Sequence, residues 1–248
     1  MKQTFLLLAL VLAALSSGAA DLLLWYRQPA TNAIDEGLPI GNGRMGALVL
    51  GAVEQEQFVL NEDSLWTGDE NPSGNYDTMG AYQTLGKVLV NLPGSGETSV
   101  YRRELDLNQA LVRVIYQRNG ANYKREVFCS YPAGVLVARF SADTPGQYTG
   151  SISLQDSHGA PIVWSANRMT AAGHLSNGLS YEWQVLVVPQ AGGLKVDGDS
   201  LQLDRCDGLL LFIAAGTDYA MKPLAHFRGQ EPHALISSRL ESARNKGY

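Results

Sequence analysis

Nine residues in the first third of the sequence gather side chains that could bind a ligand or catalyse a reaction. The segment Leu60–Gly68 reads LNEDSLWTG, with two carboxylates, an amide and an indole close together. Carboxylate oxygens accept hydrogen bonds from hydroxyl groups, and an indole can cover the apolar face of a sugar ring. Glu62 and Asp63 could also serve as the acid and base of a glycoside hydrolysis. The residue types therefore allow either sugar binding or catalysis.

The adjacency of Glu62 and Asp63 argues against catalysis by this pair. Consecutive side chains of a strand point to opposite faces, so the two carboxylates would not flank one bond. We therefore expect a structural role, in which Asn61 and Asp63 cap or brace a turn and Trp66 packs against the protein. Catalysis by the two carboxylates is the alternative.

A second segment of interest is Leu38–Gly46, which reads LPIGNGRMG. Its three glycines allow a tight backbone turn, from which Asn42 and Arg44 would project polar groups. The simplest interpretation is a loop that leads into a strand at Gly46. We do not expect a dinucleotide-binding fingerprint, because no strand is expected before this segment and no helix after it. The Gly-Lys-Ser/Thr ending of a phosphate loop is also missing.

Strands are the elements that must position these two segments. Gly46–Val53 is an apolar run suited to a strand buried on both faces, and Phe58–Leu60 would continue a hairpin from it. Turn signals such as Asn119-Gly120 separate the later strand patterns. These patterns cover Lys87–Leu92, Val100–Leu107, Leu111–Gln117, Tyr123–Ser130, Gly134–Ser141, Tyr148–Leu154, Ile162–Trp164, Tyr181–Val188, Ser200–Leu203 and Leu209–Ala215. The sequence therefore predicts an all-β fold, an antiparallel sandwich or barrel.

One helix is expected, near the C-terminus. Pro232–Asn245 has Leu235, Ile236, Arg239, Leu240 and Ala243 at helical spacing. We expect no long amphipathic helix before Glu231. A helix that begins there would have little to pack against, which we interpret as a hint that the chain is incomplete.

Composition excludes several classes of protein. Of the 248 residues, 45% are hydrophobic and 17% are charged, which is unlike a disordered chain. The net charge is −5 and no basic run is long enough to follow phosphates, so nucleic acid is not an expected partner. The spacing of Cys129 and Cys206 matches no zinc motif, and the two thiols could be paired or free. The four scattered histidines, His158, His174, His226 and His233, are expected to be surface or loop residues rather than metal ligands.

The first 20 residues have the order of a secretory signal peptide. Lys2 precedes an apolar run from Phe5 to Leu15, and small residues follow from Ser16 to Ala20. The run is shorter than the roughly 20 residues that span a bilayer, and no later segment is apolar enough to do so. We therefore predict cleavage near Ala19 or Ala20, a secreted or periplasmic protein, and no membrane association.

Several motifs together carry a resemblance to a known family. The motifs are WYRQPA at Trp25–Ala30, PIGNGRMGALVLG from Pro39, NEDSLWTG at Asn61–Gly68, YRRELDL at Tyr101–Leu107, YKREVF at Tyr123–Phe128 and AAGTDY at Ala214–Tyr219. Together they make the chain resemble the amino-terminal domain of glycoside hydrolase family 95, the α-L-fucosidases, over about residues 24–248.

The resemblance implies a domain organisation and a chemistry. Residues 1–20 would be the signal peptide, 21–230 an antiparallel β super-sandwich, and 231–248 the start of an α-helical linker. In such enzymes an (α/α) barrel then hydrolyses terminal α-L-fucosyl linkages of glycans, typically α-1,2, with inversion. A glutamic acid protonates the leaving oxygen there, and asparagine side chains assisted by an aspartate activate a water. None of these barrel residues maps onto this chain, so we expect no catalytic residue, no metal and no organic cofactor here.

The resemblance also suggests what the front domain does. We expect it to pack on its own (α/α) barrel and to shape the mouth of that barrel. The candidate residues for this interface or for the rim of the sugar pocket are Asn42, Arg44, Asn61, Glu62, Asp63 and Trp66. A free-standing carbohydrate-binding module and a purely structural or interaction domain are the alternatives. Tyr181, Trp183 and Trp164 are expected to pack inside the sandwich rather than to form a sugar-binding row.

Overall fold

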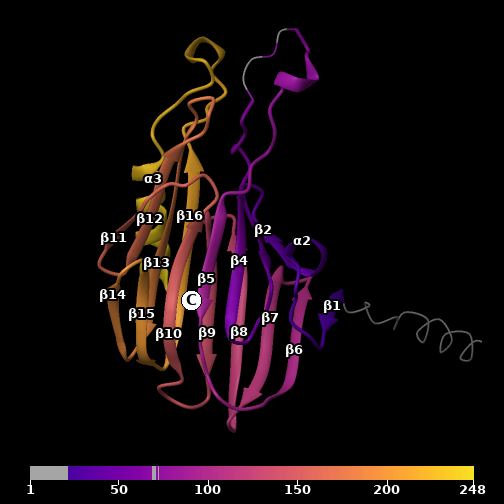
Figure 1. Cartoon of the computed structure of the whole chain (residues 1–248), viewed down its shortest axis with the longest axis vertical. Helices are drawn as coiled ribbons and strands as arrows, with labels where there is room; N and C mark the ends of the chain where they lie inside the picture. Colours follow the sequence, from indigo (N-terminus) through magenta and orange to yellow (C-terminus); the bar gives the residue numbers. More distant parts are fainter. Residues whose placement is uncertain (1–21, 69–70, 72) are drawn as a thin grey trace, which may run out of the picture.

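The computed structural model describes residues 22–68, 71 and 73–248, which form two antiparallel β-sheets and one long helix (Figure 1). The two sheets stack as a sandwich, which confirms the predicted all-β antiparallel fold. The predicted signal peptide, residues 1–20, lies outside the described residues. In the part of the chain that the structure describes, no helix is both long and apolar enough to cross a membrane.

The larger sheet has nine strands in the order β1-β6-β7-β8-β9-β16-β13-β12-β11. Its central strands, β9 and β16, pair antiparallel from Gly208 opposite Ser141 to Ile213 opposite Leu136. The strands of this sheet are β1 (Leu23–Tyr26), β6 (Thr98–Asp106), β7 (Leu111–Arg118), β8 (Ala121–Ser130), β9 (Val135–Ala142), β11 (Ile162–Ser165), β12 (Arg168–His174), β13 (Ser180–Gln190) and β16 (Gly208–Thr217).

The smaller sheet has seven strands in the order β14-β15-β10-β5-β4-β3-β2. The hairpin predicted from the apolar run at Gly46 is present, because β3 pairs with β4 from Met45 opposite Glu62 to Val49 opposite Phe58. The strands of this sheet are β2 (Leu38–Gly41), β3 (Met45–Val49), β4 (Gln55–Glu62), β5 (Gly86–Asn91), β10 (Tyr148–Asp156), β14 (Gly193–Asp197) and β15 (Ser200–Cys206). A short helix, α2 (Ala33–Glu36), precedes β2.

The hydrophobic core lies between the two sheets. Phe58 and Leu60 of the smaller sheet and Phe140 of the larger one are buried in it. Trp183 and Tyr181 are also buried, as predicted, while Trp164 is partly buried against the core. Indole Nε1 of Trp183 donates a hydrogen bond of 2.9 Å to Asp156, which pairs its one polar atom.

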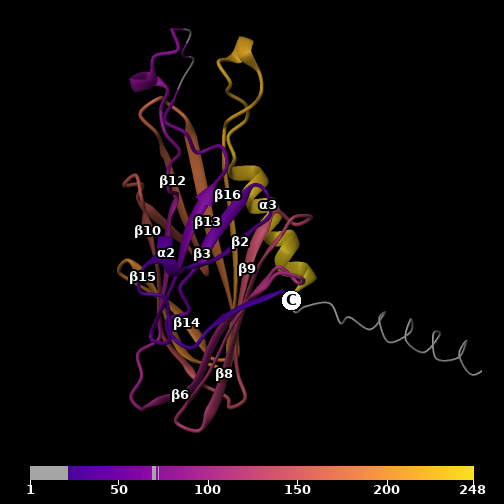
Figure 2. The same cartoon turned by 90° about the vertical axis from the view of Figure 1, so that its right-hand side faces the viewer.

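The C-terminal helix α3 (His233–Lys246) confirms the predicted element but not its predicted lack of packing. The helix lies against the outer face of the larger sheet, over β9, β13 and β16 (Figure 2). Ile236, Leu240 and Ala243 are buried in this contact. The reason is that every residue of β16 is buried, so this strand is apolar on both faces. Its uninterrupted run, Leu209–Ala215, is typical of a strand covered on both sides and indicates a cover for the outer face.

The apolar run at Gly46 is less buried than the sequence predicts. Its strand, β3, alternates between buried and partly exposed residues, so it is buried on one face and not on two. Strand β2 was also not expected, and it contains Pro39. Proline lacks the N–H that a central strand needs, but β2 is an edge strand of its sheet and tolerates the loss.

Both cysteines are free in the structure, although the sequence allowed a disulfide. Cys206 is buried, and Cys129 is partly buried on β8. Burial raises the pKa of the Cys129 thiol to about 12. The thiol is therefore held in its protonated, unreactive form near neutral pH.

Two extensions project beyond the sandwich at the same end of the molecule (Figures 1 and 2). The first extension comprises residues 63–68, 71 and 73–84, between β4 and β5, and the second comprises residues 218–231, between β16 and α3. Gly68 and Gly80 let the two arms of the first extension approach closely, since a Cβ at Gly80 would overlap the Gly68 backbone. The NEDSLWTG segment therefore forms the root of an extension.

Candidate binding cleft

A cleft of about 800 Å³ lies between the two extensions. Residues of four separate segments line it, so only the fold brings them together. The lining residues are Arg44, Asp63, Ser64, Trp66, Gly68, Asn71, Asn177, Leu179, Tyr219, His226, Phe227 and Arg228. Three of the six residues predicted from the sequence, Arg44, Asp63 and Trp66, are among them.

The Asn42–Arg44 turn joins β2 to β3 at the base of the cleft. Asn42 stabilises the turn, because its Oδ1 accepts hydrogen bonds from the backbone N–H groups of Arg44 (3.1 Å) and Met45 (2.9 Å). Its Nδ2 donates to the carbonyl of Ser130 on the larger sheet, at 3.1 Å. A strand thus precedes this turn, contrary to expectation, but strand β3 follows it, so the segment is still no dinucleotide-binding fingerprint.

Arg44 extends from the turn toward Glu62 at the end of β4. Its Nη2 lies 2.9 Å from Oε1 of Glu62, whose side chain is 0% exposed, whereas the Arg44 side chain is 41% exposed. Oε1 accepts no hydrogen bond of good geometry from the described residues. Burial raises the pKa of the Glu62 carboxyl above its ordinary value, and the opposing effects of Ser64 and Arg44 are smaller. Glu62 is therefore a buried acid with an incomplete set of partners.

The other oxygen of Glu62 organises the root of the first extension. Oε2 accepts hydrogen bonds from the backbone N–H (2.8 Å) and the hydroxyl (2.7 Å) of Ser64. That hydroxyl lies 2.5 Å from the Thr217 hydroxyl at the end of β16. Glu62 thus links the first extension to the strand from which the second one begins.

The expected roles of Asn61 and Asp63 need correction. Glu62, rather than either of these residues, braces the turn with its side chain. The reason is register: Glu62 continues the buried face of β4, so its carboxylate reaches the backbone N–H of Ser64, whereas Asp63 points outward. Asp63 lines the cleft, and the opposite burial of the two carboxylates confirms that they do not flank one bond. Asn61 lies in β4 opposite Gly46, away from the cleft lining.

Trp66 is also placed differently from our expectation. Its side chain is not packed in the core, since the residue is 40% exposed and lines the cleft. Indole Nε1 donates to the carbonyl of Met79 at 3.0 Å, which fixes the ring on the first extension. Asn177, in the turn before β13, holds the backbone from the side, because its Nδ2 donates to the carbonyls of Trp66 (3.0 Å) and Gly68 (2.6 Å).

The second extension supplies the other wall, which our sequence analysis did not identify as part of a site. The rings of Tyr219 and Phe227 are nearly parallel, with centroids 6.4 Å apart. Arg228 donates through Nη2 to the carbonyl of Asn177 at 3.0 Å, and its Nε lies 3.8 Å from Asp218. One signal was available, because the AAGTDY motif that contributed to the resemblance ends at Tyr219.

The carboxylates and histidines near the cleft bear on the chemistry that its described lining could perform. Asp63 is the single carboxylate among its described lining residues, whereas acid–base hydrolysis of a glycoside uses two. Within residues 22–68, 71 and 73–248, no group of three His, Cys, Asp or Glu side chains is placed to hold a metal ion. His226 lines the cleft, while His233 contacts Glu182, His158 contacts the carbonyl of Thr84, and His174 lies on β12.

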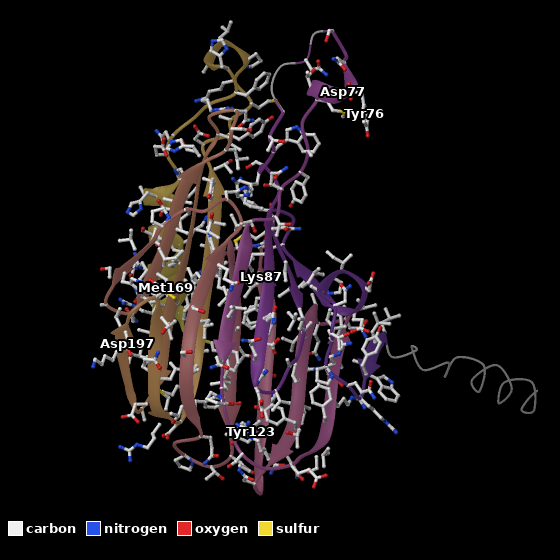
Figure 3. All side chains as sticks on the ribbon, in the orientation of Figure 1. Tyr76, Asp77, Lys87, Tyr123, Met169 and Asp197 are labelled. Atoms are coloured by element: carbon white, nitrogen blue, oxygen red, sulfur yellow. The ribbon has the colours of Figure 1, made fainter. Side chains whose placement is uncertain are left out.

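Apolar side chains lie exposed on both extensions around the cleft. Tyr76, at the outer part of the first extension (Figure 3), is largely exposed, as is Leu224 on the second. The further exposed apolar residues are Trp66, Met79 and Tyr82 on the first extension and Tyr219 and Met221 on the second. Exposed apolar side chains gathered at one end of a domain are typical of a surface that another molecule or domain covers.

Comparison with known proteins connects the chain to carbohydrate-active enzymes. A family model described as "Glycosyl hydrolase family 65, N-terminal domain" matches residues 24–81 and 73–222. The first match contains Leu38–Gly46, which forms the base of the cleft, and Leu60–Gly68, which forms part of one wall.

Two similar proteins are named as α-fucosidases. "Probable alpha-fucosidase A" of Aspergillus niger is 27% identical over 93% of this chain and 35% of its own length. "Alpha-L-fucosidase 2" of Arabidopsis thaliana is 30% identical over 54% of this chain and 20% of its own length. The chain therefore spans about a third or less of the length of these relatives. A solved structure, "Putative kojibiose phosphorylase from human microbiome", covers 90% of this chain and 34% of its own, with a TM-score of 0.49 and 10% identity.

Proposed function

Because the chain belongs to the glycosyl hydrolase family 65 N-terminal domains, we propose that it is the non-catalytic front domain of a secreted α-L-fucosidase-like enzyme. Its relatives support the fucosidase part of this proposal, and the motifs of glycoside hydrolase family 95 support the finer assignment. In this proposal the end that carries the cleft packs on a catalytic (α/α) barrel. That barrel hydrolyses terminal α-L-fucosyl linkages, typically α-1,2, with inversion.

One observation carries the proposal: three of the family-like motifs, those containing Arg44, Trp66 and Tyr219, meet at one end of the sandwich, where apolar side chains are exposed. Arg44 and Trp66 come from the two densest motifs and line the same cleft. Tyr76 and Leu224 lie exposed on opposite extensions. A domain that acted alone would be expected to cover such residues, whereas a domain that meets a second one uses them as its interface.

The experiment is a comparison of this chain with the product of the complete reading frame. We expect the reading frame to continue beyond the codon for Tyr248 into a barrel, and the longer protein to release fucose from 2′-fucosyllactose. This chain alone should release none. A stop codon directly after Tyr248, or fucose release by this chain alone, would contradict the proposal.

A matched pair of variants in the longer protein tests the role of the cleft end. Trp66→Ala should lower fucose release, because it removes an exposed side chain from the proposed interface. Trp25→Ala removes an indole of similar exposure from β1, outside the cleft lining, and should leave fucose release unchanged. Equal fucose release by the two variants would show that the cleft end has no role in the activity of the enzyme.

A further inference from the structure

The two arginines that line the cleft each lie near a carboxylate of the protein. Arg44 lies 2.9 Å from Glu62, and Arg228 lies 3.8 Å from Asp218. Bidentate binding of a phosphate or carboxylate needs guanidinium N–H groups that are free to donate, and these carboxylates compete for them. The cleft therefore does not have the electrostatics of an anion-binding site, although two arginines line it.

Many of the polar side chains in the cleft are already engaged with the protein. The Asn177 amide holds two backbone carbonyls of the first extension and the N–H of Leu179. The Ser64 hydroxyl contacts Glu62 and Thr217. Asp63 differs, because its carboxylate makes no hydrogen bond or ion pair with the other described residues. An ionised carboxylate has two acceptor oxygens, which suit the adjacent hydroxyl groups of a saccharide.

Aromatic rings stand on both walls of the cleft. The hydrogen bond from Trp66 to the Met79 carbonyl holds the indole in place while 40% of the residue remains exposed. Tyr219 and Phe227 lie nearly parallel on the opposite wall. The aromatic rings offer apolar surfaces to the C–H groups of a sugar ring, and the Asp63 carboxylate offers acceptors to its hydroxyl groups.

From these observations we propose that the cleft binds a neutral saccharide unit, with Trp66 covering an apolar face of the ring and Asp63 accepting from two adjacent hydroxyls. The inference rests on the proposed function for its expectation that the ligand is a glycan. It means that this domain, in addition to the barrel, contacts the glycan. The unit bound would belong to the part of the glycan that the barrel does not cleave. The internally paired arginines predict that acidic saccharides bind less well.

The test uses the 248-residue chain, titrated with lactose, 2′-fucosyllactose and 3′-sialyllactose and followed by intrinsic tryptophan fluorescence and by the indole N–H signals in NMR spectra. Lactose and 2′-fucosyllactose should both give saturable changes, with affinities within about threefold of each other. The acidic 3′-sialyllactose should bind at least fivefold more weakly, because its carboxylate would approach Asp63.

Three variants assign the binding to the cleft. Trp66→Ala should lower the affinity for lactose at least tenfold, and Asp63→Asn, which keeps the side-chain shape, at least threefold. Trp25→Ala is the control and should bind as the wild type does. Because Asp63 is exposed and has no side-chain partner among the described residues, Asp63→Asn keeps the test valid if Trp66→Ala fails to fold.

The outcomes separate this inference from the proposed function. Absence of saturable lactose binding, stronger binding of 3′-sialyllactose, or full binding by folded Asp63→Asn would overturn the saccharide site. If the longer protein still released fucose, the proposed function would stand without it. Saccharide binding by a chain whose reading frame stops after Tyr248 would instead support the site and contradict the fucosidase proposal.

Discussion

Strand β4 carries two buried glutamates on one face, and their surroundings differ sharply. Glu56, near the start of the strand, has both carboxylate oxygens bonded: Oε1 accepts from the N–H groups of Gly51 (2.7 Å) and Gln57 (3.1 Å), and Oε2 accepts from Arg125 (2.9 Å). Glu62, at the other end, has one oxygen held by Ser64 and another that accepts no well-aligned hydrogen bond from the described residues.

The arginines of the two pairs differ in the same way. Arg125 is fully buried between the sheets and also donates to the carbonyls of Ala52 (2.5 Å) and Val53 (2.6 Å). Arg44 belongs to a turn and keeps 41% of its side chain exposed at the cleft. The first pair thus fixes a loop within the sandwich, whereas the second leaves part of the Arg44 side chain exposed where the extensions begin. This contrast separates a structural region from the region proposed to bind other molecules.

The largest expected effect follows from breaking the structural pair. Arg125→Met should lower the free energy of unfolding by about 3–5 kcal/mol, because it leaves the Glu56 carboxylate buried beside an apolar side chain. Urea unfolding of the 248-residue chain measures this change. A loss below about 1 kcal/mol would show that the interior tolerates Glu56 without its arginine.

A smaller effect is expected from the corresponding change at the cleft. Arg44→Met should lower the free energy of unfolding by about 1–3 kcal/mol, since it leaves a single buried acceptor less well satisfied. Ser64 still holds the other oxygen of Glu62, and the lost guanidinium was partly solvated. The same urea experiment checks the order of the two variants. Equal losses for Arg44→Met and Arg125→Met would remove the contrast between the two regions.

Trp66→Ala should change stability still less, by about 1 kcal/mol or below, because the indole lies on the first extension outside the core. Trp183→Ala is the matched control inside the sandwich, where loss of a buried indole costs about 3–5 kcal/mol. Thermal unfolding of both variants gives the comparison. If Trp66→Ala unfolded at as low a temperature as Trp183→Ala, the first extension would be part of the stabilising core.

The smallest expected effect is a pH dependence. Burial raises the pKa of Glu62 in the folded chain above its ordinary value of 4.5, so the folded chain takes up this proton at a higher pH than the unfolded one. The wild type should therefore gain stability relative to Glu62→Gln as the pH falls from 7 toward 4.5. Urea unfolding at several pH values measures the difference, with exposed Glu97→Gln as the control. A wild type that loses stability relative to Glu62→Gln over this range would refute the assigned shift.

Much of the fold followed from the sequence because the strands are long and rich in apolar and β-branched residues. Strands β6 to β10 lie within a few residues of their predicted ranges, as does helix α3. Strand β12 was missed because Arg168–His174 has one β-branched residue, Thr170, among alanine, glycine and polar residues. The packing of α3 was also missed, since it depends on which face of β16 remains uncovered after the sandwich forms.

The cleft was predictable only on one side. Arg44, Asp63 and Trp66 stand in dense local motifs, so their residue types drew attention in the sequence. Arg228 and Asn177 have no such neighbourhood, because they reach the cleft through contacts between segments far apart in the chain. Strand alternation predicted that the side chains of Glu62 and Asp63 point in opposite directions. It did not predict that Glu62 braces the turn, because this depends on the register at the end of β4.

Hydrogen exchange tests the central claim most directly, by comparing this chain with the product of the complete reading frame. The account predicts that backbone amides of residues 73–84 and 218–231 exchange more slowly in the longer protein, because the cleft end is covered by the barrel. Amides of β7 and β8, within the larger sheet, should exchange equally in both and serve as the internal reference. Unchanged exchange in both extensions, with the longer protein folded and active, would contradict the claim that this end meets the catalytic domain.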